Sequence, residues 1–351
     1  MNAATRNLAG RRILLIGIGF YDYEKCIADR LRERGAELTV FEDLPLRLRE
    51  GVYAAFARRF RWDTRDLVAR HEASMLEVAE RQKFDQVIVI KGVGLSVPFL
   101  KALRERLPAA EFVLYQWDSM ARLEGIQERL PLFDRVLTFD RLDALANPSF
   151  QFRPLFYRNG PAAAPVKEDL DISFVGWLHS DRLEAIRRMQ ALAAASGLRS
   201  HVYLFTGWLT WFKLLLRGNS RDIHLRPLGY AELMRINTRS RCIYDLPHAA
   251  QSGLTMRTIE ALGLGKKIVT SATDVIHYDF CSKENVSLIA TSGPAFDVEF
   301  VRRPGVPVAD TVLRRYALDA WLDDVVGPVD GKVSPKAESS WTPASQASQA
   351  H

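Results

Sequence analysis

Two separate series of alternating strand and helix patterns most restrict what this chain can fold into. Short apolar runs that end in glycine or a polar residue alternate with segments of helical spacing, which predicts parallel sheets covered on both faces. In the first series we expect strands at 12–17, 37–41, 86–90, 112–117 and 135–139, and helices at 23–34, 64–82 and 97–106. In the second we expect strands at 171–175, 201–205, 242–246, 267–270 and 286–290, and helices at 181–195, 255–264 and 309–325.

The pattern stops at the Asn-Gly-Pro-Ala-Ala-Ala-Pro segment that begins at Asn159, which is typical of a linker. It predicts an α/β chain with an N-terminal domain at 1–160 and a C-terminal domain at 161–328. Aliphatic residues become rare after that point, so residues 329–351 are predicted to be a disordered tail. Two doubly wound domains facing each other would leave a cleft at the carboxyl ends of both sheets, where such sheets bind ligands.

Composition limits the classes of ligand and the cellular compartment that we expect for this protein. The net charge of +6 and the pI near 9.2 favour anionic ligands such as nucleoside diphosphates, and no Lys/Arg block indicates nucleic acid. Cys26, Cys242 and Cys281 lie far apart, without the spacing of a disulfide framework or a zinc site. The sequence has neither a signal-peptide pattern nor a run of 18 apolar residues, so we expect a cytoplasmic protein.

The stretch at 251–270 carries the most specific functional signal. A glycine turn at Gly253 precedes a helix that begins near Thr255, and the free N–H groups at such a helix start suit a diphosphate. Thr255 can cap the helix. Arg257 and Glu260 are three residues apart and therefore share a helix face, where the arginine could steady phosphates and the carboxylate could accept ribose hydroxyls. An ordinary surface helix with a Glu–Arg pair is the alternative.

This stretch resembles the donor-binding motif of GT-B glycosyltransferases, in particular the bacterial CgeB-like and group 1 transferases. The resemblance implies two Rossmann-like domains, with the diphosphate held by Gly253, Leu254 and Thr255 and the ribose by Glu260. It also implies metal-independent hexosyltransferase-type transfer from a nucleotide sugar, without a further cofactor, in bacterial surface polysaccharide or lipopolysaccharide synthesis. Many retaining members carry a second glutamate where this chain has Ser252, so the stereochemical outcome stays open.

Weaker resemblance extends to other segments. The segment at 171–182 is similar to the first strand and turn of the family's C-terminal domain. The resemblance implies that Gly176, His179, Ser180 and Arg182 contact the donor phosphates. For His179 and Ser180, capping of the following helix is the alternative. In the first half, the segments at 17–25 and 115–119 also resemble this family.

Glycosyl transfer needs a base for the acceptor hydroxyl. Acidic side chains end or follow several predicted strands of the first half, and we select Asp118 and Asp22, with a capping or salt-bridge role as the alternative for each. The Asp-x-Asp at Asp169 and Asp171 precedes its strand, so we interpret it as a solvated turn and predict no metal site.

The segment at 208–217 combines tryptophan, phenylalanine and leucine with Lys213 and Arg217. That composition suits peripheral contact with the inner face of a membrane, where a lipid-linked acceptor would be found. A buried helix with one wet edge is the alternative.

Two other functions remain in competition. The Gly17-Ile18-Gly19 turn after the first strand is the feature that favours an NAD(P)-dependent oxidoreductase. However, Asp22 stands where the dinucleotide-binding fingerprint has its third glycine. A non-catalytic binding or assembly protein could also retain this fold without turnover.

Overall fold

The computed structural model describes residues 6–19, 22–49, 51–160, 166–178, 182–248, 251–290 and 296–327, and within these the side chains of Val52, Ala55 and Arg58 are left aside. The contacts of the described residues divide the chain into two compact units. Unit 1 runs to Pro154 and takes up the chain again from Asp319, and unit 2 comprises Leu155–Leu318. The predicted tail, 329–351, lies outside the described residues.

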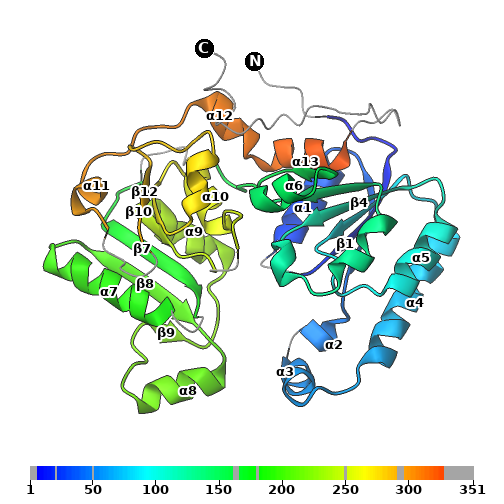
Figure 1. Ribbon diagram of the computed structural model, residues 1–351, viewed down its shortest axis with the longest axis horizontal. Coiled ribbons are helices and arrows are strands. Elements are labelled where there is room, and N and C mark those ends of the chain that lie inside the picture. The colour runs from blue at the N-terminus through cyan, green and yellow to red at the C-terminus, as the bar shows by residue number, and fades with distance from the viewer. Residues whose placement is uncertain are drawn as a thin grey trace. The chain divides into compact units, whose positions relative to one another are not determined.

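Unit 1 is built on a parallel sheet with the strand order β2-β1-β3-β4-β5-β6 (Figure 1). The strands are Arg12–Gly17 (β1), Glu37–Glu42 (β2), Gln86–Ile90 (β3), Glu111–Gln116 (β4), Arg135–Thr138 (β5) and Phe150–Phe152 (β6). The helices are Tyr23–Glu33 (α1), Leu46–Arg49 (α2), Gly51–Phe60 (α3), Arg65–Arg81 (α4), Val97–Arg106 (α5), Arg141–Ala146 (α6) and Leu318–Val326 (α13), with short 3₁₀ turns at Met120–Arg122, Ile126–Glu128 and Leu130–Leu132.

Helices cover both faces of this sheet, as the continuous apolar strands require. On one face Leu14, Val87 and Phe112 pack with Met75 of α4 and Phe99 of α5. On the other face lie α1 and α13, joined by an ion pair between Arg30 and Asp319, and the ring of Trp321 sits 4.8 Å from that of Tyr115.

Unit 2 has a second parallel sheet, with the order β12-β11-β10-β7-β8-β9 (Figure 1). The strands are Leu170–Trp177 (β7), Ser200–Phe205 (β8), Ile223–His224 (β9), Ser240–Asp245 (β10), Lys267–Thr270 (β11) and Val286–Leu288 (β12). The helices are Arg182–Ala195 (α7), Trp208–Leu216 (α8), Tyr230–Arg239 (α9), Met256–Gly263 (α10), Val298–Arg302 (α11) and Asp310–Arg315 (α12), with a 3₁₀ turn at Thr273–His277.

Counted in chain order within unit 2, the strands are arranged 3-2-1-4-5-6, which is the order of the doubly wound nucleotide-binding fold. The α/β prediction with two Rossmann-like sheets is therefore confirmed. One expected helix, 309–325, is instead two: α12 ends at Arg315, and Tyr157 donates its backbone N–H to the carbonyl of buried Tyr316 (2.9 Å) before α13 begins. Because α13 packs on the first sheet, the C-terminal part of the chain returns to unit 1, and the contact boundary lies at Pro154 rather than at residue 160.

Candidate functional site

The strand order of unit 2 places a topological switch point at the carboxyl ends of β7 and β10. These two strands are neighbours in the sheet. The chain leads from β7 to β8 on one side of this pair and from β10 to β11 on the other side. The loops that follow them diverge, and open α/β sheets bind ligands at this switch point. Side chains that contact Val175, Trp177, Asp245 or Leu246 therefore lie at this switch point.

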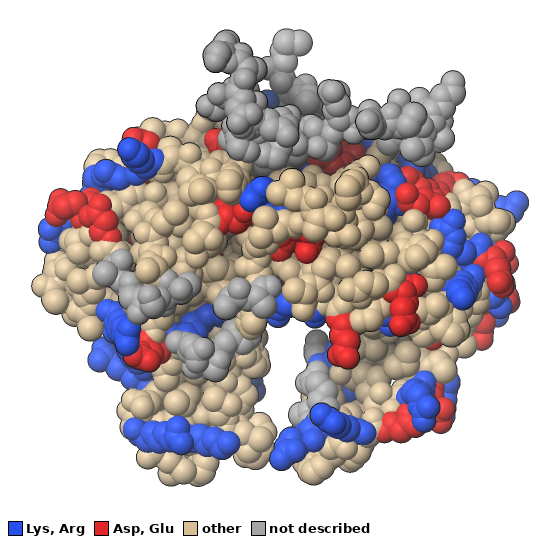
Figure 2. All heavy atoms as spheres, in the orientation of Figure 1, with Lys and Arg blue, Asp and Glu red and all other residues tan. Residues whose placement is uncertain are grey.

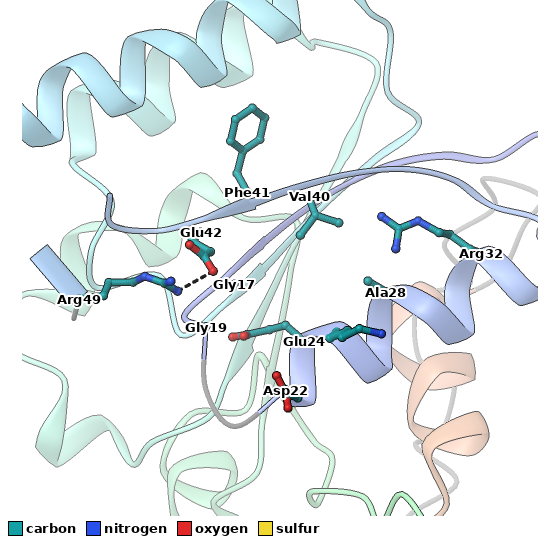
Figure 3. Close-up of a pocket in the computed structure, with 11 residues that line it drawn as sticks. Gly17, Gly19, Asp22, Glu24, Ala28, Arg32, Val40, Phe41, Glu42 and Arg49 are labelled. Atoms are coloured by element: carbon teal, nitrogen blue, oxygen red, sulfur yellow. Dashed lines mark ion pairs between the residues drawn. The ribbon is translucent and has the colours of Figure 1, made fainter. Parts of the chain in front are cut away.

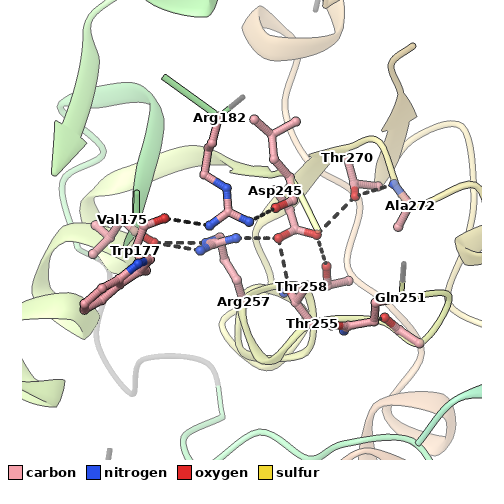
Figure 4. Close-up of polar contacts among 12 residues, drawn as sticks. Val175, Trp177, Arg182, Asp245, Gln251, Thr255, Arg257, Thr258, Thr270 and Ala272 are labelled. Atoms are coloured by element: carbon pink, nitrogen blue, oxygen red, sulfur yellow. Dashed lines mark hydrogen bonds and ion pairs between the residues drawn. The ribbon is translucent and has the colours of Figure 1, made fainter. Parts of the chain in front are cut away.

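Arg257, near the start of α10, extends to both strand ends (Figure 4). Its Nη1 donates to Asp245 Oδ1 (2.6 Å), and its Nε and Nη2 donate to the carbonyl of Val175 (3.1 and 2.9 Å). The position of the guanidinium depends on Gly176, because a Cβ there would lie 2.6 Å from Arg257 Nη2. Gly176 thus contributes to the site because its missing side chain leaves room for the Arg257 guanidinium.

Arg182, at the start of α7, reaches the same two strands. Its Nη1 donates to the carbonyl of Trp177 (2.8 Å) and its Nη2 to that of Leu246 (2.5 Å). Burial, followed by the nearby Arg257 charge, lowers the pKa of Arg182 to about 10. The side chain is therefore still a cation at neutral pH, and the structure brings the two predicted arginines together.

A buried carboxylate that the sequence interpretation did not select organises this cluster. Asp245 is fully buried at the end of β10. Besides Arg257, it accepts hydrogen bonds from the hydroxyls of Thr255 (2.9 Å), Thr258 (3.0 Å) and Thr270 (3.2 Å). Its position at the end of an apolar strand is the sequence feature that could have identified Asp245 as a site residue.

The predicted turn before α10 is positioned by the same carboxylate. Thr255 caps the helix, accepting from the Thr258 N–H (3.3 Å), and its hydroxyl is tied to Asp245. Gly253 accepts a hydrogen bond from Gln251, and Leu254 is buried. Two guanidinium groups and one carboxylate leave an excess positive charge, next to the positive end of a helix, which is an environment that attracts anions.

Glu260 lies in a different environment from Arg257. It is buried, with 2% of its surface exposed, and its carboxylate accepts from the Tyr230 hydroxyl (3.2 Å) and from the backbone N–H of Arg158 (3.4 Å). The Arg158 guanidinium stacks 3.7 Å from the centre of the Tyr230 ring. Although Arg257 and Glu260 are three residues apart, they contact different groups. The sequence analysis did not select Tyr230 or Arg158 as site residues. The remaining donor-site predictions, His179 and Ser180, lie outside the described residues.

Unit 1 contains a cavity of about 360 Å³ at the carboxyl ends of β1 and β2 (Figure 3). Its lining combines carboxylates and cations with the apolar side chains of Ala28, Val40 and Phe41. The lining residues are Gly17, Gly19, Asp22, Glu24, Lys25, Ala28, Arg32, Val40, Phe41, Glu42 and Arg49. Arg49 pairs with Glu42 (2.7 Å) directly over Gly19, where a Cβ would lie 1.6 Å from Arg49 Nη1. Such a lining offers both hydrogen-bond donors and acceptors to a polar ligand.

The two predicted base candidates are in different settings. Asp22 precedes α1 with a left-handed backbone (φ 58°), makes no side-chain capping bond, and lines the cavity. Asp118 follows β4, and its carboxylate is held between Lys91 (2.6 Å) and Arg122 (2.7 Å). Asp118 thus forms salt bridges, as its alternative interpretation expected, and Asp22 lines the cavity.

Two further features concern metals and membranes. Asp169 and Asp171 pair with Arg239 and Arg199, and within the described ranges we find no group of three or more His, Cys, Asp and Glu placed to hold a metal ion. None of the helices in the described part of the chain combines the length and apolarity needed to cross a bilayer.

Comparison with known proteins identifies the type of fold. No family model matches the chain, and a search of curated proteins finds no match. Among solved structures, α,α-trehalose-phosphate synthase (UDP-forming) from Burkholderia xenovorans superposes with a TM-score of 0.57 at 14% identity, covering 91% of this chain and 100% of that one. Anabaena HepE, solved in complex with UDP, gives 0.56 at 10% identity, covering 90% and 98%.

Sucrose-phosphate synthase from Thermosynechococcus elongatus gives a TM-score of 0.54 at 11% identity, covering 89% of this chain and 91% of that chain. These likenesses extend over both units and show that the fold is of the GT-B type.

Proposed function

We propose that this chain is a glycosyltransferase that takes a sugar from a nucleoside diphosphate donor bound at the switch point of unit 2. One observation carries the proposal: Arg182 and Arg257 meet at the ends of β7 and β10 with the buried carboxylate of Asp245 as their neighbour. That arrangement leaves positive charge where a diphosphate would sit. The GT-B fold of the chain is in keeping with this activity.

The proposed reaction breaks the bond between the anomeric carbon and the phosphate oxygen and joins that carbon to an acceptor oxygen. The acceptor proton passes to a base, and the departing diphosphate gains charge. Arg182, Arg257 and the backbone N–H groups at the start of α10 stabilise that charge, and preorganised donors of this kind account for much of the acceleration in many enzymes. We infer that these groups allow transfer without a metal ion.

For the donor, we propose that Glu260 accepts the ribose hydroxyls. Its carboxylate accepts a hydrogen bond from the hydroxyl of Tyr230, the same kind of donor that a ribose hydroxyl would offer. Uridine diphosphate is the first nucleotide to test, since HepE was solved with it.

For the acceptor, we propose the unit 1 cavity, with Asp22 as the base and Asp118 as the second candidate. Sugar hydroxyls both donate and accept hydrogen bonds, so a lining of mixed charge suits a glycan or a lipid-linked glycan. Surface polysaccharide or lipopolysaccharide assembly on the cytoplasmic side of a membrane is the process that we propose.

The geometry of the first glycine turn disfavours the oxidoreductase alternative. The Glu24 carboxylate accepts the backbone N–H of Ile18, and a Cβ at Gly17 would lie 2.6 Å from Glu24 Cγ. A carboxylate of the chain thus occupies the position where a dinucleotide-binding turn receives pyrophosphate.

A thermal-shift screen with UDP, GDP and NAD tests the donor site. We expect a nucleoside diphosphate to raise the melting temperature, because a ligand that binds only the folded state stabilises it. The shift, measured against each variant's own baseline, should vanish in Glu260→Ala and persist in Glu184→Ala, an exposed glutamate on α7. Stabilisation by NAD and not by UDP or GDP would overturn the proposal.

Turnover needs a second measurement. Release of the nucleoside diphosphate from nucleotide sugars should depend on added glycan acceptor. Nucleotide binding without any acceptor-dependent release would support the non-catalytic binding protein instead.

A further inference from the structure

Helix α8 of unit 2 presents an apolar surface to solvent. Five of its side chains are between 44% and 73% exposed: Trp208, Leu209, Phe212, Leu215 and Leu216. None of the residues of this nine-residue helix is buried. In Figure 1 the helix projects from unit 2 beyond β8 and β9, away from the helices that cover the sheet.

The helix divides into three arcs at 3.6 residues per turn. The five exposed apolar residues share one arc of about 120°. Trp211 and Leu214 form the second arc and pack against the unit 2 core, with the Trp211 indole N–H donating to the carbonyl of Ile223 (3.1 Å). Thr210, Lys213 and Arg217 form the third. The core therefore holds α8 by one side and leaves the widest apolar arc outward, which is a correction to the alternative of a buried helix.

Cations predominate along α8 and the turn that follows it, where Arg221 pairs with the adjacent Asp222 (3.7 Å). From Gly207 to Arg221 the sequence contains Lys213, Arg217 and Arg221 and no carboxylate. Figure 2 shows a band of Lys and Arg atoms on uncharged surface at this end of unit 2.

Unit 1 carries a second surface of the same chemistry, on and after α3. Tyr53, Phe56, Phe60 and Trp62 are between 39% and 58% exposed and contact one another, with ring centres 5.5 Å apart for Tyr53–Trp62 and 5.7 Å apart for Phe56–Phe60. Between Gly51 and Trp62 the sequence has three arginines and no carboxylate.

We propose that α8 and the α3 aromatic cluster are docking surfaces for an anionic lipid membrane. Aromatic and leucine side chains enter the interface between headgroups and acyl chains, and flanking lysine and arginine side chains bind acidic headgroups. A lipid surface explains why exposed aromatic side chains occur next to lysine or arginine residues independently on two units. The inference goes beyond glycosyl transfer and stands or falls without it.

Flotation of the full-length protein with vesicles tests the proposal. We expect binding to vesicles of phosphatidylcholine with phosphatidylglycerol, much weaker binding to phosphatidylcholine alone, and release at about 1 M salt, where the Debye length is about 3 Å. Because each cation near an acidic surface adds about fivefold to binding, Lys213→Glu with Arg217→Glu should lower the partition coefficient at least tenfold.

Phe212→Ser with Leu216→Ser, and Phe56→Ser with Phe60→Ser, should each lower binding about tenfold or more by removing inserted apolar surface. Lys101→Glu and Val306→Ser, which change exposed residues elsewhere, serve as matched controls and should bind as wild type. Unchanged melting temperatures establish that the variants fold. Absence of wild-type flotation at low salt would overturn the proposal, as would equal binding by the α8 variants. Self-association that these substitutions abolish, without vesicle binding, would point to a protein partner.

Discussion

The two units each contain a parallel six-stranded sheet and differ in the charge gathered at the strand ends. In unit 1 the turn after β1 has its Ile18 N–H bound by Glu24, and the adjoining cavity is lined by three carboxylates and three cations. In unit 2 the loops after β7 and β10 hold two guanidiniums around one carboxylate. The comparison shows that two parallel sheets of different strand order can present either excess positive charge or balanced charge, according to a few residues at strand ends.

The largest expected effect would come from unit 1. Asp22→Asn should lower kcat about 100-fold or more, because a positioned general base contributes on that scale, while UDP affinity stays unchanged. The measurement is steady-state kinetics with a titration of UDP. Asp118→Asn is the matched variant. A larger loss of kcat there would transfer the role of base to Asp118.

The next effect should be confined to unit 2. Arg182→Met should weaken UDP binding about 10- to 100-fold, since a charge-assisted hydrogen bond to phosphate contributes about 1.5–3 kcal/mol. Arg49→Met, the unit 1 counterpart paired with Glu42, should leave the UDP dissociation constant in calorimetry at the wild-type value. Equal losses in both variants would contradict the assignment of the donor to unit 2.

A smaller effect concerns the space that Arg257 needs. Gly176→Ala places a Cβ 2.6 Å from Arg257 Nη2, so we expect a loss of about 1–3 kcal/mol in the free energy of unfolding, with weaker UDP binding. Gly207→Ala is the control, because its Cβ would have no heavy atom within 4 Å and its φ is −67°. Denaturant titration should show no more than about 0.5 kcal/mol for that control.

The smallest effect is a pH dependence in unit 1. Burial raises the pKa of Asp43 from 3.8 to about 6. The unfolded carboxyl therefore ionises first, and the stabilisation that the protonated group contributes is present below about pH 3.8 and is lost as the pH rises through about 6. Asp43→Asn should remove about 1 kcal/mol of the decline in unfolding free energy between pH 5 and 7. An identical pH profile for wild type and variant would contradict this assignment.

Local pattern determined most of the elements of this protein. The limits of β3, α5 and β11 agree with prediction to the residue, because β3 and β11 are short buried runs and α5 begins after the Ser96 cap and ends before Pro108. Thr255 and Arg257 could be placed at a helix start from the local pattern, whereas Gly176 and Arg182 were selected through the resemblance to GT-B glycosyltransferases. Helices α2, α3 and α6 escaped prediction. With four and six residues, α2 and α6 are too short to set a helical period, whereas α3 has the same ten residues as the predicted α5.

Only the tertiary structure decided which of these residues meet. Asp245 became the organising group because the order of strands puts β10 beside β7, a non-local pairing that no spacing in the sequence expresses. Tyr230 and Arg158 reach Glu260 from distant parts of the chain, and α13 returns to the first sheet, for the same reason. Sequence fixes local conformation through steric and hydrogen-bonding preferences, whereas long-range contacts depend on how the whole core packs.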